Sequence, residues 1–221
     1  MQPNMTGQLY LLRHGQTYWA LSGQHTGLAD VPLTAKGVEQ ASDAGIRLKA
    51  MHPADFAATY VSPMLRARQT AEAAGLDAEV VDDLHEWDYG RAEGRTRAQL
   101  AEIMGGKWDL WEDGPAVLPR EIGGERVENL PDGTPVTVAG GDGETLDEVY
   151  ERAGRVVAQV RPFIDRGEDV LLVAHSHILR MVTVAWCGLP AIAGRTFELG
   201  TAQFSVLGVH KGQPVIQHWG L

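Results

Sequence analysis

The sequence predicts an α/β fold of three layers: a mostly parallel central sheet with helices on both faces, and a cap-like excursion from the core. Three observations lead to this expectation. Apolar strand candidates alternate along the chain with amphipathic helix candidates. Val170–Ala174 is apolar throughout, as expected for a strand that is buried on both faces. Residues 112–143 interrupt the alternation with a stretch rich in glycine, proline and charge.

The other strand candidates are short runs rich in apolar or β-branched residues. The first, Leu9–Leu12, is apolar throughout and should also be buried. In chain order the remaining candidates are Phe56–Val61, Glu79–Leu84, Phe204–His210 and Pro214–Trp219. The last two of these flank Lys211-Gly212-Gln213, an arrangement that is typical of a hairpin.

Capping residues mark where the first two helices begin. Thr34 can cap a helix that runs to about Met51. Ser62 and Pro63 are typical of the N-cap and first position of a helix that runs to about Ala74. The apolar residues expected on the buried side of the first helix are Val38, Ala41, Ile46 and Leu48.

Three helices are expected in the second half of the chain. One covers about Arg97–Met104. Thr145-Leu146-Asp147-Glu148 is a capping box that opens a long helix ending near Pro162. The third follows the most apolar strand, covers about Ile178–Cys187 and ends at Gly188.

We expect residues 1–221 to form a single domain. A chain of 221 residues that is 44% hydrophobic can bury one large core. Residues 87–145 are expected to form a cap or lid, which includes an insertion over residues 115–141. Pro131-Asp132-Gly133 is a turn signal between two short strand candidates, and it indicates a small hairpin in the insertion.

Charge and composition argue against several classes of partner. The net charge of -10 disfavours nucleic acid and anionic membrane surfaces. No apolar run approaches the ~20 residues of a membrane span, and we expect no signal peptide. The single cysteine, Cys187, allows no internal disulfide, which favours a cytoplasmic location. The oligomeric state stays open, with a homodimer among the alternatives.

Five side chains with cationic, acidic or basic character follow strand candidates. Arg13, His14 and His175 come directly after two of them, and Arg66 and Glu86 come shortly after two others. Ligands of open parallel sheets bind at the carboxyl ends of strands, so these groups converge if their strands are neighbours. Arginine fits phosphate oxygens, a neutral imidazole can attack phosphorus, and a carboxylic acid can protonate a leaving oxygen. The set predicts phosphoryl transfer through a phosphohistidine.

Each residue taken alone also has an ordinary structural explanation. Arg13-His14 and Arg66 could simply lie on the solvated surface. His175 could be a core histidine, and Glu86 could be a charged loop residue. His175 and His177 could ligate a metal, but alternate strand residues face opposite sides, and no cysteine or clustered carboxylate supports such a site. We therefore expect no metal.

The stretch Leu11–Thr17, LLRHGQT, resembles the signature of the histidine phosphatase superfamily, which includes the cofactor-dependent phosphoglycerate mutases. The resemblance extends from residue 9 to about residue 180 and implies a phosphoglycerate mutase-like fold. The stretches Arg66–Thr70 and Glu86–Gly90 are most similar to the acid phosphatase and sedoheptulose bisphosphatase branches. The other similar blocks are Thr26-Gly27 with Asp30, Pro32–Thr34, Ser62-Pro63, Glu93-Gly94, Trp108, Trp111, Gly143–Thr145 and Val173–His175.

The resemblance implies a role for each residue. His14 is the nucleophile, Arg13 binds the phosphoryl oxygens, and Arg66 and His175 stabilise the transferring phosphoryl. Glu86 acts first as general acid and then as general base. The implied substrate-binding set is Arg13, Gln16, Thr26, Gly27, Arg66, Tyr89, His175 and Ser176, with backbone amides available at Thr26 and Gly27.

Two electrostatic expectations accompany these roles. A backbone carbonyl should fix the tautomer of His14, and burial beside Trp87 should keep Glu86 protonated. Ala20 stands where many members of the family carry a polar residue that contacts phosphate. Ser22 or Gln24 would have to supply this contact instead. Ser176 stands where glycine is common.

The expected function is a metal-independent phosphatase of the histidine acid phosphatase type, acting without a cofactor on a small phosphorylated metabolite. The alternative is a cofactor-dependent phosphoglycerate mutase. It is disfavoured because Glu112-Asp113 stands where comparable mutases have two arginines, although Arg120 or Arg126 could still reach the site. A non-catalytic phospho-ligand binding protein is the third alternative, but it would not need both His14 and Glu86.

Overall fold

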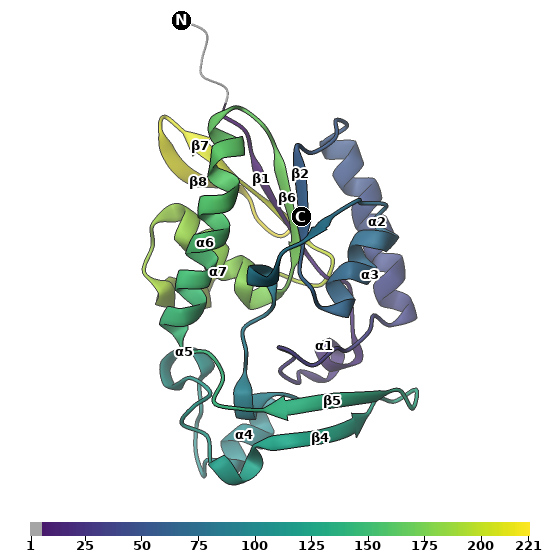
Figure 1. Cartoon of the computed structure of the whole chain (residues 1–221), viewed down its shortest axis with the longest axis vertical. Helices are drawn as coiled ribbons and strands as arrows, with labels where there is room; N and C mark the ends of the chain where they lie inside the picture. Colours follow the sequence, from purple (N-terminus) through teal and green to yellow (C-terminus); the bar gives the residue numbers. More distant parts are fainter. Residues whose placement is uncertain (1–5) are drawn as a thin grey trace, which may run out of the picture.

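The structure of the protein is a computed structural model that describes residues 6–221. A six-stranded sheet forms its middle layer. The strand order is β3-β2-β6-β1-β7-β8. Helices α2 and α3 cover one face and α6 and α7 the other (Figure 1). The predicted three-layer α/β fold is therefore confirmed. Four strands run parallel to one another: β1 (Leu9–Arg13), β2 (Ala58–Val61), β3 (Glu79–Val80) and β6 (Val170–Ala174). β7 (Phe204–His210) runs antiparallel to β1, and β8 (Gln213–His218) runs antiparallel to β7.

The helices packed on the sheet are α2 (Ala35–Met51), α3 (Leu65–Ala73), α6 (Leu146–Asp165) and α7 (Ser176–Cys187). Most predicted boundaries agree with these to within a few residues. None of the helices in residues 6–221 is both long and apolar enough to cross a bilayer.

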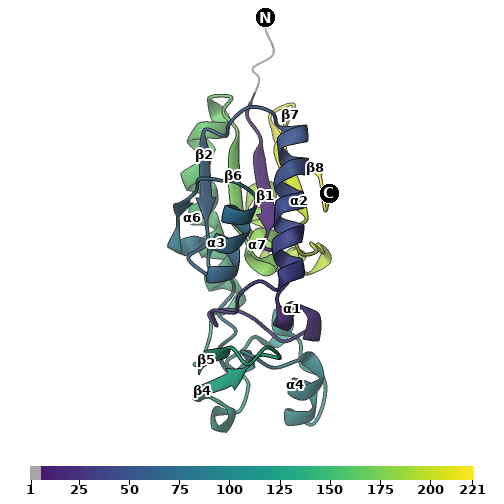
Figure 2. The same cartoon turned by 90° about the vertical axis from the view of Figure 1, so that its right-hand side faces the viewer.

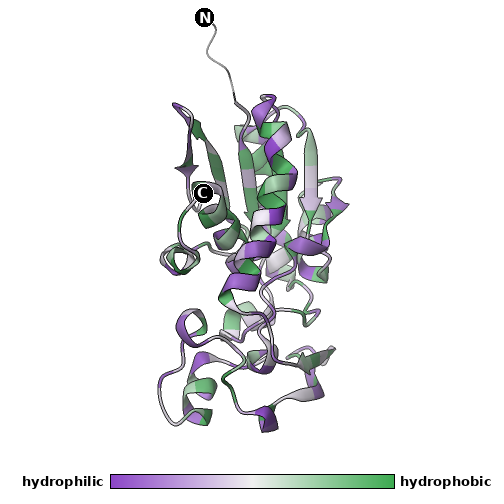
Figure 3. Cartoon of the chain, turned by 60° about the vertical axis from the view of Figure 1, so that its left-hand side comes forward, coloured by the Kyte–Doolittle hydropathy of each residue, from purple (hydrophilic) through white to green (hydrophobic). Residues whose placement is uncertain are grey.

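Each face of the sheet has its own hydrophobic core, and β6 contributes to both. Val170 and Leu172 pack in the cluster that includes α6 and α7, whereas Leu171 and Val173 pack in the cluster that includes α2 and α3. Successive strand residues point to opposite faces, so a central strand between two helical layers must be apolar at every position. Figure 3 shows hydrophobic residues concentrated on these central strands.

The buried side of α2 differs from the prediction. Val38 and Ile46 were expected to face the core, but they are 45% and 67% exposed. A Cβ on Gly37 would stand 2.1 Å from the carbonyl oxygen of Gln16, so only glycine allows α2 to dock this closely. Close docking selects small residues, which apolar periodicity does not reveal. The residues that do face the core are Gly37, Ala41, Ala44 and Leu48.

The start of α3 also differs from the prediction. The helix begins at Leu65 rather than at Ser62-Pro63. Asp30, from a distant loop, accepts a hydrogen bond from the Leu65 N–H at 2.6 Å and so caps the helix. The Ser62 hydroxyl is instead 2.7 Å from His175 Nε2. A cap supplied from elsewhere in the chain leaves no local sequence signal.

The predicted strand Glu79–Leu84 has only two strand residues, β3, and Asp82–Leu84 form a 3-10 turn. β3 is the edge strand and pairs with β2 alone. Val80 is 49% exposed there, so this apolar stretch forms a short edge strand rather than a buried strand.

The cap lies beyond the carboxyl ends of the parallel strands (Figures 1 and 2). It contains α4 (Arg97–Ile103), α5 (Leu110–Asp113) and the predicted hairpin, β4 (Gly124–Asn129) with β5 (Pro135–Gly140). Its two ends are joined. The Glu144 N–H donates to the Asp88 carbonyl at 2.9 Å, and the Trp87 indole N–H donates to the Glu144 carbonyl at 2.8 Å.

Arg152 of α6 fixes the segment that carries Glu86. Its side chain is 4% exposed and donates to the carbonyl oxygens of Asp83 at 2.8 Å and His85 at 2.7 Å. It also donates to both carboxylate oxygens of Glu144, at 2.8 and 2.7 Å. One buried guanidinium therefore joins the segment before the cap, the end of the cap and α6.

Arg152→Leu should lower the free energy of unfolding by about 3 kcal/mol, because it removes the charged partner of the Glu144 carboxylate and the donor to three carbonyls. Arg155→Leu on the same helix is the matched control. The Arg155–Asp83 pair is at the surface, with an arginine side chain 60% exposed, so its loss should cost less than about 1 kcal/mol. Denaturant unfolding measures both, and equal losses would contradict the role given to Arg152.

Candidate active site

His14 lies where β1 ends, and the backbone on both sides of it is fixed. Its N–H donates to the Ala174 carbonyl of β6 at 2.9 Å, and its carbonyl accepts from the Ala202 N–H at 3.0 Å. The ring Nδ1 is 2.7 Å from the Gly15 carbonyl oxygen. A carbonyl only accepts hydrogen bonds, so Nδ1 carries the proton and Nε2 has the free lone pair. The predicted backbone acceptor is confirmed.

The electrostatic surroundings keep the imidazole of His14 neutral. Burial lowers the pKa of His14 well below its usual range, and the positive charges of Arg66 and Arg13 lower it further. Burial and Arg66 likewise lower the pKa of His175, whose ring centroid is 5.1 Å from that of His14. Both rings therefore remain neutral at neutral pH.

Arg13 lines the same cavity as His14 and has an unsatisfied donor. Its Nη1 donates to the Leu199 carbonyl at 2.5 Å. Its Nε is buried and has no hydrogen-bond partner within residues 6–221. Arg13 lines the cavity, so its positive charge is available to an anionic ligand there.

Arg66 and His175 lie behind His14 rather than on the cavity wall. Arg66 is fully buried and donates to carbonyl oxygens of loop 26–29 at 2.8–2.9 Å. Its Nε–H donates to His175 Nδ1 at 3.0 Å, so His175 donates its Nε2–H to the Ser62 hydroxyl. Most donors of Arg66 are thus occupied, and its charge acts on the cavity mainly through its field.

Glu93, from the cap, holds the same loop from the other side. It is 2% exposed and accepts from the N–H groups of Gly27, at 2.8 and 2.9 Å, and Ala29, at 3.0 Å. The expectation that the Gly27 amide is available to substrate is therefore wrong. Because carbonyls of this loop accept from Arg66, Glu93 positions Arg66 indirectly. Burial raises the pKa of Glu93 to about 7.

Glu86 binds the N-terminus of α7. Its Oε1 accepts from the N–H groups of Ile178 and Trp87, both at 2.9 Å, and its Oε2 accepts from the His177 N–H at 3.0 Å. Burial raises the pKa of Glu86, but these bonds and the nearby histidines outweigh burial and hold the pKa well below its usual range. The expectation that burial keeps Glu86 protonated is wrong for the unliganded protein.

These groups open onto a cavity of about 220 Å³. Gln16 was expected to line it, but its Oε1 accepts from the Thr34 hydroxyl at 3.0 Å instead. Ala20 and Gln24 do line the cavity, and the Ser22 hydroxyl lies behind them, 2.5 Å from Gln24 Oε1. Of the predicted site residues, those on the wall are Arg13, His14, Thr26, Glu86, Tyr89 and Ser176.

Sequence reasoning missed several wall residues, and His177 is the most informative. Its Nδ1 is 2.6 Å from the Tyr89 hydroxyl and 3.7 Å from Glu86 Oε2. The sequence-based interpretation placed His175 and His177 on a strand, whereas α7 already begins at Ser176. Within residues 6–221, no three histidine, cysteine or acidic side chains are grouped to hold a metal ion. The other missed wall residues are Trp19, Gly23, His25 and Arg97.

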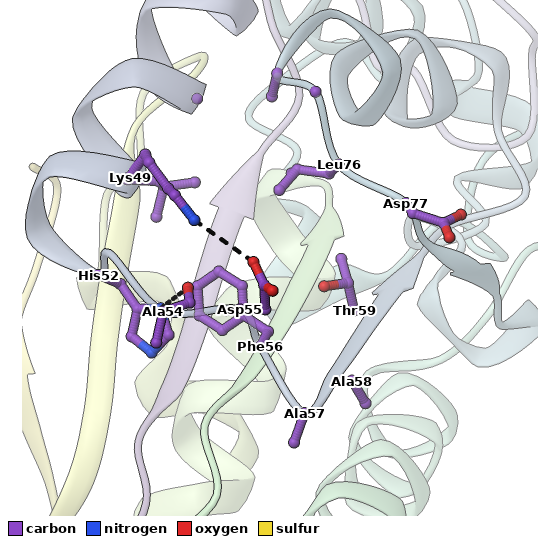
Figure 4. Close-up of a pocket in the computed structure, with 14 residues that line it drawn as sticks. Lys49, His52, Ala54, Asp55, Phe56, Ala57, Ala58, Thr59, Leu76 and Asp77 are labelled. Atoms are coloured by element: carbon purple, nitrogen blue, oxygen red, sulfur yellow. Dashed lines mark hydrogen bonds and ion pairs between the residues drawn. The ribbon is translucent and has the colours of Figure 1, made fainter.

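A larger cavity, of about 590 Å³, lies at the opposite end of the sheet, between α2, α3 and the start of β2 (Figure 4). Its one lysine, Lys49, is 3.5 Å from Asp55. It holds neither the arginines nor the paired histidines found around His14. The chemically equipped cavity is therefore the smaller one, at the carboxyl ends of the strands, where ligands of such sheets bind.

Comparisons with known proteins agree with this geometry. A family model described as histidine phosphatase superfamily (branch 1) matches residues 9–221. An acid phosphatase of Mycobacterium tuberculosis is 35% identical over 207 residues, which are 93% of this chain and 88% of that protein. Sedoheptulose 1,7-bisphosphatase of Saccharomyces cerevisiae is 30% identical over 214 residues, 85% of this chain and 70% of that protein. Phosphoglycerate mutases are also among the relatives.

Solved structures show the same architecture. That of the open reading frame Rv3214 from Mycobacterium tuberculosis superimposes with a TM-score of 0.80 at 33% sequence identity. The match covers 97% of both chains, so the cap as well as the sheet has a counterpart in that protein.

The raised pKa of Glu93 predicts a pH dependence of stability. The folded protein holds this proton more tightly than an unfolded carboxyl, whose pKa is 4.5. The stabilisation is therefore complete below pH 4.5 and is lost as pH rises to about 7. Over this pH interval the free energy of unfolding of the wild type should fall by about 2–4 kcal/mol relative to that of Glu93→Gln.

Urea unfolding of the two proteins at a series of pH values measures the difference. Glu125→Gln, at an exposed position of β4, is the control and should track the wild type. A constant difference between wild type and Glu93→Gln would show that Glu93 keeps an ordinary pKa in the folded protein.

Proposed function

We propose that this chain, which belongs to the histidine phosphatase superfamily, hydrolyses phosphate monoesters of small metabolites through a phosphohistidine on His14. The observation that carries the proposal is the neutral ring of His14, with Nε2 free, in a cavity that Arg13 also lines. The relatives named acid phosphatase and sedoheptulose bisphosphatase support hydrolysis as the reaction.

The reaction has two steps. In the first, Nε2 of His14 attacks phosphorus, the bond from phosphorus to the ester oxygen breaks, and the leaving oxygen takes a proton from Glu86. In the second, water attacks phosphorus, Glu86 accepts a proton from it, and the P–N bond breaks to release phosphate and neutral His14. Arg13 binds the phosphoryl oxygens, and the charge of Arg66 stabilises them from behind, with His175 holding the Arg66 guanidinium in place.

Glu86 must gain its proton when the substrate binds, because it is ionised in the unliganded protein. A phosphate dianion beside the carboxylate disfavours the charged form and raises the pKa of Glu86. A phosphate monoester also has a second pKa near ~6, so it can bring the proton into the cavity itself. Once Glu86 has given its proton to the leaving oxygen, the same carboxylate is ionised and can act as the base for water in the second step.

Phosphoglycerate mutase activity is the second candidate, because mutases are among the relatives. Neither Arg120 nor Arg126 lines the cavity around His14. Arg126 donates to Glu128 and to the Glu93 carbonyl instead. These contacts favour transfer of the phosphoryl to water over its return to the substrate.

The proposal keeps the other expectations from the sequence. It uses no metal and no cofactor, since a histidine, two arginines and a carboxylate supply the nucleophile, charge and proton. It places the reaction in the cytoplasm, with a small phosphorylated metabolite rather than nucleic acid or a membrane as partner.

His14 should become phosphorylated during turnover in protein treated with a chelator. Rapid quenching with labelled substrate, followed by peptide mapping, should find an acid-labile, base-stable adduct on His14. His14→Ala should lower kcat/KM by roughly 10³-fold or more, because the nucleophile is lost. His210→Ala, at an exposed position, is the control. An adduct on another residue, or full activity of His14→Ala, would overturn the mechanism.

Glu86→Gln should slow alkyl phosphates far more than an activated aryl phosphate. An alkoxide is a poor leaving group and needs the proton, whereas an aryl oxide hardly does, and general acid catalysis is worth ~10²–10⁴-fold. The measurement is kcat/KM for both substrate types in wild type and variant, because it reports the first step and excludes the hydrolysis of the phosphohistidine that both types share. Equal slowing of both types would mean that Glu86 positions α7 without donating a proton.

A further inference from the structure

A second cavity, of about 380 Å³, adjoins the one around His14. The two share His25, Arg97 and His177 on their walls, so they lie side by side. The second cavity adds Arg180 of α7 and Arg195, from the 3-10 segment that follows α7, to its wall. Three arginines therefore surround a space that the reaction at His14 does not use.

Arg180 has no carboxylate partner among residues 6–221, unlike the other two arginines. Its Nε donates to the Gly194 carbonyl at 2.8 Å, and its guanidinium stacks on Trp111, 4.7 Å from the ring centroid. These contacts hold the guanidinium of Arg180 in place. Its remaining N–H groups have no hydrogen-bond acceptor among residues 6–221. A fixed, partly buried guanidinium of this kind is suited to binding an oxyanion.

The other charges of the cavity leave it positive. Arg97 pairs with Asp109 at 2.8 Å, and Arg195 pairs with Glu112 at 2.7 Å. Two carboxylates face three guanidiniums. Glu112 was expected to repel an anionic ligand, but Arg195 compensates its charge.

Cavity size and helix geometry connect this space to the reaction. The cavity around His14, at about 220 Å³, is smaller than the ~300–1,000 Å³ typical of ligand sites, so the rest of a substrate needs the adjoining space. His177 and Arg180 are three residues apart on α7 and therefore lie on one side of the helix. The N-terminus of the same helix binds Glu86, so α7 serves both cavities.

We propose that the second cavity binds a second anionic group of the substrate, either a phosphate or a carboxylate, with Arg180 as its main contact. The inference rests on the proposed function, because the phosphoryl that is removed must occupy the cavity around His14. Preferred substrates are then small metabolites that carry two anionic groups, one at each end.

The test compares three matched sets of substrates: α,ω-alkanediol bisphosphates of increasing chain length, monophosphates of the same diols, and ω-phosphoalkanoates. Phosphate release gives kcat/KM for each. The wild type should prefer a doubly anionic set over the diol monophosphates by roughly tenfold or more at one chain length. Preference for bisphosphates would identify the second group as phosphate, and preference for phosphoalkanoates would identify it as carboxylate.

Arg180→Gln should lower this preference by roughly 10- to 100-fold, because it removes charge-assisted hydrogen bonds to one substrate class only. Arg195→Gln, at a more exposed position, should lower it less and is the second variant should Arg180→Gln fail to fold. Arg161→Gln, whose side chain pairs with Asp165 on α6, is the matched control and should keep the wild-type preference.

The outcomes separate this inference from the proposed function. Hydrolysis of every set with equal kcat/KM at all chain lengths would overturn the second anion site and leave the phosphatase intact. A preference that survives both Arg180→Gln and Arg195→Gln would also overturn it. No phosphate release from any substrate, an activated aryl phosphate included, would overturn the proposed function and the inference with it.

Discussion

The buried guanidinium of Arg66 is the constraint around which the site is assembled. A charge removed from water needs a hydrogen-bond acceptor for each donor that water can no longer reach. Here the acceptors come from loop 26–29, before α2, and from His175, after β6. Arg66 itself is on α3. Segments distant in sequence are therefore held together by the requirements of one side chain, and His14 lies in front of them.

The same charges determine which groups of the site are ionised. Burial lowers the pKa of His14 most, and Arg66 and Arg13 lower it further, so the residues that stabilise the phosphoryl group also help to keep the nucleophile neutral. Glu86 is kept ionised by backbone N–H groups of α7 and by its neighbouring histidines. The resting site therefore combines fixed positive charge, a neutral nucleophile and a carboxylate whose pKa rises when an anionic substrate binds beside it. This arrangement couples the start of the reaction to the arrival of substrate.

Most of the fold could be predicted from the sequence because its signals are local. A strand buried on both faces reads as a continuous apolar run, as Val170–Ala174 does, and a capping box marks the start of α6. Features that depend on distant partners could not be predicted in this way. The side of α2 that docks is set by the backbone near Gln16, and the start of α3 is set by Asp30.

The site shows the same division. His14, Arg13 and Glu86 were found because each follows a strand or belongs to a motif. The ionised state of Glu86 was not, because it depends on where α7 begins, which a pattern places only approximately. Gly27 was assigned to the substrate because the Thr26-Gly27 block resembles the family pattern, but only the fold reveals that Glu93 already accepts from the Gly27 N–H.

The joined ends of the cap have an evolutionary consequence. Since residues 88 and 144 meet, the intervening segment behaves as a cassette that can lengthen, shorten or be exchanged without moving the sheet. The entropic cost of closing a longer loop grows only slowly with its length, so such exchanges are inexpensive for folding. Side chains of the cassette that support the site restrict such exchanges. Glu93 supports the loop beneath Arg66, Tyr89 lines the cavity around His14, and Trp111 stacks on Arg180, so a replacement must supply equivalent contacts.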